Sequence, residues 1–190
     1  MHVSLLQLVA WIELLACWIL WVLAFVRPSR EAKGQKKAVR ASSSRWGIGL
    51  VSVSFFLVWV WVRPQGFEKT LPELILSMVL GPPSVLLGWS AARELGKQWR
   101  YEAALSEDHQ LVQTGPYRWI RHPIYTSMFG MLMATGAAYS WWPMWVAGLV
   151  FFIIGTEIRV RAEDRLLADR FGQAFEAWRK RVPAYLPFLR

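Results

Sequence analysis

Long apolar stretches alternate with short polar ones along this chain. Five apolar runs stand out, at residues 3–26, 46–62, 71–89, 124–139 and 142–158. The first holds 24 residues with one charge, Glu13, and a helix of about 20 residues is enough to cross a bilayer core. No basic segment precedes this run and no small-residue cleavage site follows it, so we expect it to be retained. The pattern predicts an all-α integral membrane protein with five transmembrane helices.

The order of the runs predicts two further helical features. Only the stretch Ser140, Trp141, Trp142 and Pro143 separates the last two runs, so their helices should form an antiparallel hairpin. Beyond them, apolar residues at helical spacing predict an amphipathic C-terminal helix, broken near Gly172, that lies on the membrane or on the cytoplasmic loop; they are Leu166, Leu167, Phe171, Phe175 and Trp178. The proline-rich, apolar tail 181–190 should pack as a lid or strap.

The basic residues indicate how the chain is oriented. Twenty of the 22 Lys and Arg residues lie in segments 27–45, 93–121 and 159–190, and only Arg63 and Lys69 lie elsewhere. With five spans, the three basic segments fall on one side, so the positive-inside rule places the N-terminus outside and the C-terminus in the cytoplasm. A net charge of +9 then reflects orientation and attraction to lipid headgroups rather than nucleic-acid binding. The expected partner is the bilayer, and no obligate protein partner is evident.

Composition excludes several classes of protein. Hydrophobic residues make up 55% of the chain and 13 residues are Trp, which does not describe a soluble domain. The single cysteine, Cys17, lies in the first apolar run, so an internal disulfide, a cysteine zinc site and a redox pair are excluded. The motifs GxGxxG, GxxxxGK[ST], HExxH and GxSxG are missing, and we expect no metal.

Two polar segments flank the hairpin and hold most of the residues capable of chemistry. In the first, Gly115-Pro116 predicts a turn, and His122-Pro123 predicts an extended dipeptide that leads into a helix. Helix N-terminal N–H groups beside Arg121 and His122 would seat a carboxylate or phosphate. The alternative is that Arg121 and His122 only mark the membrane interface, with an aromatic belt made of Tyr117, Trp119 and Tyr125.

The second segment begins at the end of the fifth run. Arg159 and Glu163 are four residues apart, on one face of a helix that leaves the bilayer, and Glu157 lies nearer the bilayer. Ionisable residues at such depth usually face a polar cavity or each other, which indicates a functional role. The alternative is an ordinary salt bridge with snorkelling arginines, which accounts well for Arg161 and Arg165.

These residues together resemble the isoprenylcysteine carboxyl methyltransferase family, in its small prokaryotic type. The resemblance covers roughly the last 95 residues, in order and spacing. It rests on His109-x-Leu111-Val112, Gly115-Pro116-Tyr117, Arg121-His122-Pro123-x-Tyr125, Arg159-x-x-x-Glu163-Asp164, Phe171-Gly172 and Arg181-Val182-Pro183-x-x-Leu186-Pro187-Phe188. Ser127 departs from the family, where a Gly is common, and is expected to narrow the cofactor cleft.

The resemblance implies S-adenosyl-L-methionine as cofactor and S-adenosyl-L-homocysteine as product. Arg159 is implied as the substrate-binding residue, and Arg159 with Glu163 as the catalytic pair. The implied cofactor-binding residues are His109, Gln110, Leu111, Val112, Tyr117, Arg121, His122, Pro123, Ile124, Tyr125, Glu163 and Asp164.

The resemblance divides the chain in two. Residues 1–92 would hold three transmembrane helices with the basic cytoplasmic loop 27–45, and residues 93–190 would form the methyltransferase region. Within that region we expect the loop 93–123, the hairpin 124–158 and the cytoplasmic helix and tail 159–190. A methyl sulfonium is already activated, so a carboxylate accepts the methyl group without a metal or general base.

Four functions remain open from the sequence. The first is methylation of the carboxylate of an isoprenylcysteine-like, lipophilic substrate at the cytoplasmic membrane face. The second is N-methylation of a phospholipid or other lipid, for which an arginine clamp is less suited. The third is a small membrane reductase that uses a nicotinamide cofactor, which the His109 and Arg159/Glu163 motifs oppose. The last is a membrane scaffold, which leaves the spacing of the motifs unexplained.

Overall fold

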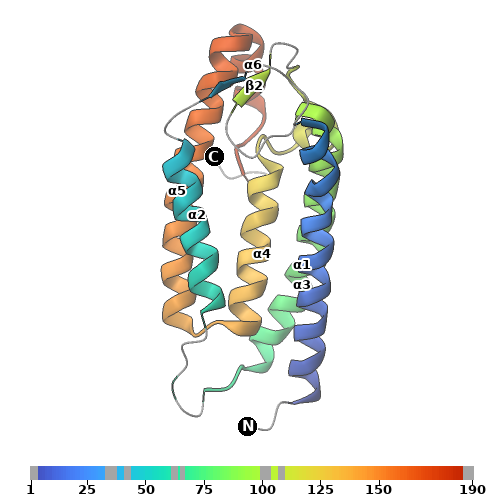
Figure 1. Cartoon of the computed structure of the whole chain (residues 1–190), viewed down its shortest axis with the longest axis vertical. Coiled ribbons are helices and arrows are strands. Elements are labelled where there is room, and N and C mark those ends of the chain that lie inside the picture. The colour runs from blue at the N-terminus through green and yellow to red at the C-terminus, as the bar shows by residue number, and fades with distance from the viewer. Residues whose placement is uncertain are drawn as a thin grey trace.

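In the part of the chain that the structure describes, five long helices form a bundle (Figure 1). The structure is a computed structural model that describes residues 4–32, 38–40, 44–60, 64, 67–98, 104–106 and 110–185. Each predicted apolar run is found as a helix, with the bounds α1 Leu5–Ala32, α2 Ser44–Trp59, α3 Leu71–Leu95, α4 Pro123–Tyr139 and α5 Trp142–Phe171. Three of them, α1 over Leu5–Val26, α3 and α5, are long and apolar enough to cross a membrane, and α2 is a shorter apolar helix. The all-helical prediction is confirmed; the five-span count and the orientation stay predictions.

The helices alternate in direction, so α1, α3 and α5 all end at the same end of the bundle (Figure 1). We call this the site end. It also carries α6 Gln173–Arg181, the 3-10 turns η1 Gly96–Gln98 and η2 Gly115–Arg118, and a two-stranded antiparallel ribbon of β1 Ala38–Arg40 and β2 Ala104–Ser106. In the ribbon Val39 lies opposite Leu105. The ribbon was not predicted, because strands of three residues are too short to show a period of two.

The hairpin prediction is right for the connection and direction of α4 and α5 but incomplete for their packing. α4 lies centrally, between the pair α2 and α5 and the pair α1 and α3 (Figure 1), and it packs most extensively along α3. α5 in turn packs mainly along α2. Small residues explain this choice of neighbours, because they let helix backbones approach closely in a membrane: Gly47 and Gly155 meet at the α2–α5 contact.

Partly buried hydrogen bonds from tryptophans of α1 fix this helix against the bundle. The indole Nε1 of Trp18 donates to Thr135 Oγ1 at 3.0 Å, and that of Trp21 donates to Ser127 Oγ at 2.7 Å. Ser127 Oγ then donates to the carbonyl of Ser84 in α3 at 2.7 Å. A buried indole N–H usually finds such a partner. The Ser127 hydroxyl therefore serves the packing of α1, α3 and α4.

The end of the bundle opposite the site end holds a buried lysine. The Lys69 side chain is 0% exposed, and its Nζ donates to Glu73 Oε1 at 3.0 Å and to the carbonyl of Gly136 at 3.1 Å. It also lies 5.3 Å from the centre of the Phe67 ring. Gly136 belongs to the last turn of α4, where a cation is favoured by the helix dipole. Lys69 thus joins the start of α3 to the end of α4.

We expect Lys69→Met to lower the free energy of unfolding by about 2 to 3 kcal/mol, because it leaves the Glu73 carboxylate and a buried carbonyl without their cation. Thermal unfolding in detergent measures the effect. Glu68→Gln changes the charge of the exposed neighbouring residue and is the control. Equal melting temperatures for the two variants would contradict this role of Lys69.

Candidate active site

A polar cluster lies at the site end, where the start of α4 meets the last turns of α5. Pro123 occupies the first turn of α4, and His122 precedes it as the N-cap with φ −125°. With ψ 62°, His122 is not in the extended conformation that the sequence predicted. Arg121 and His122 meet α5, which contributes Arg159, Glu163 and Asp164. The structure therefore joins the two polar segments that the sequence singled out.

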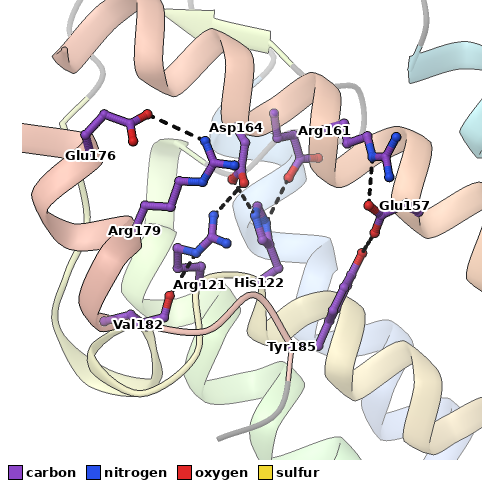
Figure 2. A network of polar contacts seen from close by, with 10 residues as sticks. Arg121, His122, Glu157, Arg161, Asp164, Glu176, Arg179, Val182 and Tyr185 are labelled. Atoms are coloured by element: carbon purple, nitrogen blue, oxygen red, sulfur yellow. Dashed lines mark hydrogen bonds and ion pairs between the residues drawn. The ribbon is translucent and has the colours of Figure 1, made fainter. Parts of the chain in front are cut away.

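Asp164 is fully engaged by the first segment (Figure 2). Its Oδ2 accepts a hydrogen bond from Arg121 Nη1 at 2.5 Å, and its Oδ1 lies 2.9 Å from His122 Nε2. The other ring nitrogen of His122, Nδ1, lies 3.4 Å from Glu163 Oε2. Both ring nitrogens thus face carboxylates, an arrangement that a protonated imidazolium satisfies because both of its nitrogens donate.

The protonation of His122 follows from these contacts. Burial on its own lowers the pKa of His122, but the hydrogen bonds to Asp164 and Glu163 and the charges of both outweigh burial, so the pKa is raised above 6.5. A histidine whose pKa is higher in the folded state stabilises it fully below the unfolded value of about 6.5. This contribution is lost as the pH rises through the folded pKa.

We therefore expect the melting temperature to fall as the pH is raised from about 6.5 through the folded pKa of His122. Thermal unfolding of the wild type and of His122→Gln across this range measures the effect. The difference between the two proteins should shrink with rising pH, because the glutamine does not titrate. A difference that stays constant would show that the imidazolium contributes nothing.

Tyr125 forms the centre of the other half of the site. Its hydroxyl accepts a hydrogen bond from Arg159 Nε at 2.7 Å and donates one to Glu163 Oε1. The Arg159 guanidinium carbon lies 5.4 Å from the centre of the Tyr125 ring. The direct separation between Arg159 Nη2 and Glu163 Oε1 is 3.9 Å. The predicted pairing of Arg159 with Glu163 therefore runs mainly through the Tyr125 hydroxyl, and Arg159 is held buried at 9% exposure.

The chain after α6 crosses the start of α4. The backbone N–H groups of Arg121 and His122 donate to the carbonyls of Pro183 and Ala184, each at 2.9 Å. The Thr126 hydroxyl donates to the carbonyl of Tyr185 at 2.7 Å. The tail therefore occupies the N–H groups of Arg121 and His122. The predicted seat for a carboxylate or phosphate, at the helix N-terminal N–H groups beside these two residues, stays a prediction. The expected strap is found over residues 182–185; residues 186–190 lie outside the described residues.

Glu157 anchors the same tail to α5. Its Oε2 accepts a hydrogen bond from the Tyr185 hydroxyl at 3.0 Å, and its Oε1 accepts one from Arg161 Nε at 2.8 Å (Figure 2). Burial, followed by the hydrogen bond to Glu157, raises the pKa of Tyr185, so this side chain remains a neutral donor. Sequence reasoning missed Tyr185, because its partner is 28 residues away and no local spacing signals the contact.

The segment before α4 packs on α6. Leu111, Val112 and Ile124 contact a buried cluster that includes Tyr117, Phe175 and Trp178. Pro123 is fully buried, and Gln110 is exposed, with its N–H donating to Gln98 Oε1 at 2.6 Å. His109, an implied cofactor residue, lies outside the described residues. Trp119 is exposed, and the Arg118 guanidinium carbon lies 4.8 Å from the centre of its ring.

Glu94, at the end of α3, holds the turn that presents Tyr117. Gly115 has φ +56°, a conformation that favours glycine, and a Cβ there would lie 2.9 Å from Glu94 Oε2. The Thr114 hydroxyl donates to the same carboxylate. Burial, then the charges of Glu163 and Glu94, raise the pKa of Tyr117 and keep it neutral. The Gly115-Pro116 turn signal is confirmed, whereas the sequence offered no sign of Glu94.

The two neighbouring acidic residues of the cluster, Glu163 and Asp164, differ in what they offer a ligand. Both oxygens of Asp164 are engaged, and its side chain is 12% exposed. The Glu163 side chain is 26% exposed, and its Oε2 has its nearest cation, His122 Nδ1, at 3.4 Å. A carboxylate that is partly exposed can accept a cationic ligand. Within the described ranges, no group of three His, Cys, Asp or Glu side chains is arranged to hold a metal ion.

Comparison with known proteins finds relatives for this chain. The protein-S-isoprenylcysteine O-methyltransferase of Schizosaccharomyces pombe is 30% identical over 87 residues, 44% of this chain and 36% of that protein. The mouse enzyme of the same name is 31% identical over 88 residues, 45% of this chain and 30% of that protein. The cobalt-zinc-cadmium resistance protein CzcN of Cupriavidus metallidurans is 30% identical over 168 residues, 86% of this chain and 74% of that protein.

The family match covers the region that contains the polar cluster. The isoprenylcysteine carboxyl methyltransferase (ICMT) family matches residues 75–169, half of the chain. The matched range includes α3 from Ile75 onward, the turn before α4, α4 itself and α5 up to Asp169. It therefore contains every residue of the cluster except those of the C-terminal strap. This chain belongs to the isoprenylcysteine carboxyl methyltransferase family.

Proposed function

We propose that this chain transfers a methyl group from S-adenosylmethionine to the carboxylate of an isoprenylcysteine-like, lipophilic acceptor at the cytoplasmic membrane face. The carrying observation is the buried Arg159 guanidinium, held by Tyr125 beside the partly exposed Glu163. One cation and one anion at the same place suit an acceptor that is an acid and a cofactor that is positively charged.

Arg159 is the residue we assign to the acceptor carboxylate. Its Nε is used by Tyr125, and its guanidinium lies near the Tyr125 ring, so its orientation is set before an acceptor arrives. A guanidinium presents donors in a fixed fork that matches a carboxylate. Because Tyr125 and Glu163 share its charge, Arg159 orients the acceptor more than it neutralises it, and the carboxylate keeps its nucleophilicity.

Glu163 is the residue we assign to the positive charge of the cofactor. When bound, S-adenosylmethionine supplies an activated methyl group. Tyr125 fixes Glu163 Oε1, and His122 lies beside Oε2, so the carboxylate is oriented by two neighbours. The packing of Tyr117 against α6 and the strap over Arg121 close one side of the cluster. Such closure excludes water from a displacement that needs only correct alignment.

The acceptor is assigned to a lipophilic class because of the setting of the cluster. It lies at one end of a bundle whose helices expose large apolar side chains, among them Leu15 on α1, Leu86 on α3 and Ile153 on α5. An acceptor with a prenyl tail would remain in the membrane while its carboxylate reaches Arg159. The name of CzcN concerns metal resistance and specifies no acceptor. The proposal therefore names the class of the acceptor and not one physiological compound.

The test uses the purified chain in lipid with methyl-labelled S-adenosylmethionine and farnesylcysteine as acceptor. We expect label in the lipid phase that base releases as methanol, as a carboxyl methyl ester requires. Phosphatidylethanolamine vesicles in a parallel reaction test the alternative N-methylation, whose label base does not release. Calorimetry shows whether the chain binds the cofactor. If it binds the cofactor but the label is stable to base, or neither reaction yields label, the proposal is overturned.

A further inference from the structure

The path of the Arg159 side chain crosses a glycine of a different helix. Gly47 lies buried in the first turns of α2, where this helix meets α5. A Cβ built on Gly47 would lie 2.6 Å from Arg159 Cγ and 2.7 Å from the carbonyl oxygen of Gly155. Real Cβ atoms essentially never come within 3.0 Å of a heavy atom. Any side chain at position 47 therefore displaces the Arg159 stem, the α5 backbone, or both.

We propose that Gly47 is a positioning residue for Arg159, because its lack of a side chain leaves the space through which the Arg159 side chain reaches Tyr125. The Arg159 stem lies over Gly47, and the guanidinium extends to α4, where Nε meets the Tyr125 hydroxyl at 2.7 Å. Gly47 thereby acts on the site through the space it leaves and not through a polar group. The inference rests on the proposed function for the role of Arg159, since the position of the guanidinium affects activity only if it binds an acceptor.

Two other glycines separate this role from helix packing. A Cβ on Gly155 would meet the carbonyl oxygen of Gly47 at 2.9 Å, Leu50 Cβ at 2.9 Å and the N of Val51 at 3.0 Å, all of them atoms of α2. A Cβ on Gly49 would meet nothing within 4 Å. Gly155→Ala therefore disturbs the α2–α5 contact without Arg159 among its nearest neighbours, and Gly49→Ala changes only the helix propensity of α2.

The first measurement compares the kinetics of the three alanine variants. A misplacement of about 1 Å in a catalytic arrangement costs about 100-fold in rate, so we expect Gly47→Ala to lose about 100-fold in kcat/KM for the acceptor. The KM for the acceptor should rise, while the dissociation constant of S-adenosylmethionine stays within about twofold of the wild-type value, a difference below 0.5 kcal/mol. For Gly155→Ala, the fold-loss in kcat/KM per folded molecule should be at least ten times smaller than that for Gly47→Ala. The kcat/KM of Gly49→Ala should match that of the wild type. Equal losses for Gly47→Ala and Gly155→Ala would overturn the proposal.

The second measurement is a double-mutant cycle on melting temperature, which does not depend on activity. Arg159→Ala removes Cγ and Cδ, so Gly47→Ala should lower the melting temperature less in that background than in the wild type. The shift for Gly155→Ala should be the same in both backgrounds. If Gly47→Ala folds only when Arg159 is also replaced, the proposal is supported. If the double variant also fails to fold, the contact with Gly155 dominates and the proposal is wrong.

The two measurements distinguish failure of this inference from failure of the proposed function. If the wild type transfers no methyl group but Gly47 and Arg159 are coupled in the cycle, the proposed function is refuted and the positioning of Arg159 by Gly47 is supported. An active wild type without that coupling would retain the function and refute the positioning role of Gly47.

Discussion

Arg159→Ala is expected to remove methyl transfer to the acceptor while leaving cofactor binding nearly intact. The loss in kcat/KM should reach about 100-fold or more, since the variant removes the group that orients the carboxylate. Arg159 contacts Tyr125 through Nε, and the same hydroxyl still donates to Glu163 after the substitution. The dissociation constant of S-adenosylmethionine, measured by calorimetry, should therefore change little.

The matched control for this prediction is Arg165→Ala. Arg165 lies on the same helix and is exposed, so its loss removes one positive charge without touching the cluster. Activity of this variant should equal that of the wild type. A similar loss in both variants would mean that the basic character of α5, and not the placement of Arg159, supports the reaction.

The second large effect is expected for Glu163→Gln, which keeps the size of the side chain and removes its charge. A hydrogen bond to a charged group contributes about 1.5 to 3 kcal/mol, so the dissociation constant of S-adenosylmethionine should rise about 10- to 100-fold. The glutamine carbonyl still accepts from Tyr125, so the fold of the cluster should persist. Calorimetry on the purified protein in detergent measures the change.

Glu176→Gln serves as the control for Glu163→Gln. Glu176 lies on α6 with its side chain 48% exposed and pairs with Arg179 at 3.6 Å on the surface. Its neutralisation should leave cofactor affinity unchanged. If Arg159→Ala and Glu163→Gln weakened cofactor binding equally, the division between an acceptor residue and a cofactor residue would be refuted.

Much of the fold follows from local pattern. The helices were predicted because apolar runs of sufficient length form helices in a membrane, where the backbone must satisfy its own hydrogen bonds. The break at Gly172, with φ +51°, and the apolar face of α6 follow the same periodicity. These features depend on residues within one or two turns of each other, so a single sequence contains them. The predicted end of the hairpin at residue 158 is wrong, because α5 continues to Phe171 and takes in Leu166 and Leu167 of the predicted amphipathic helix.

The pairing of the helices and the internal connections of the site required the tertiary structure. The short link between α4 and α5 indicated neighbours, yet their larger contacts are with α3 and α2, because close approach depends on which small residues face each other. The spacing of Arg159 and Glu163 suggested a direct pair, but the Tyr125 hydroxyl from α4 lies between them. The tail carbonyls accept hydrogen bonds from the N–H groups of Arg121 and His122, a contact that no local pattern signals.

For this chain, local order along the sequence was enough to identify the helices, the polar segments and the family motifs. Which carboxylate is engaged and which is exposed, how Glu157 holds the tail and why Gly47 lies under Arg159 were decided by contacts between elements. Such contacts join residues tens of positions apart, and each depends on the rotation and distance of two helices. Periodicity reports which face of a helix is apolar, but it carries no information about the partner which that face meets.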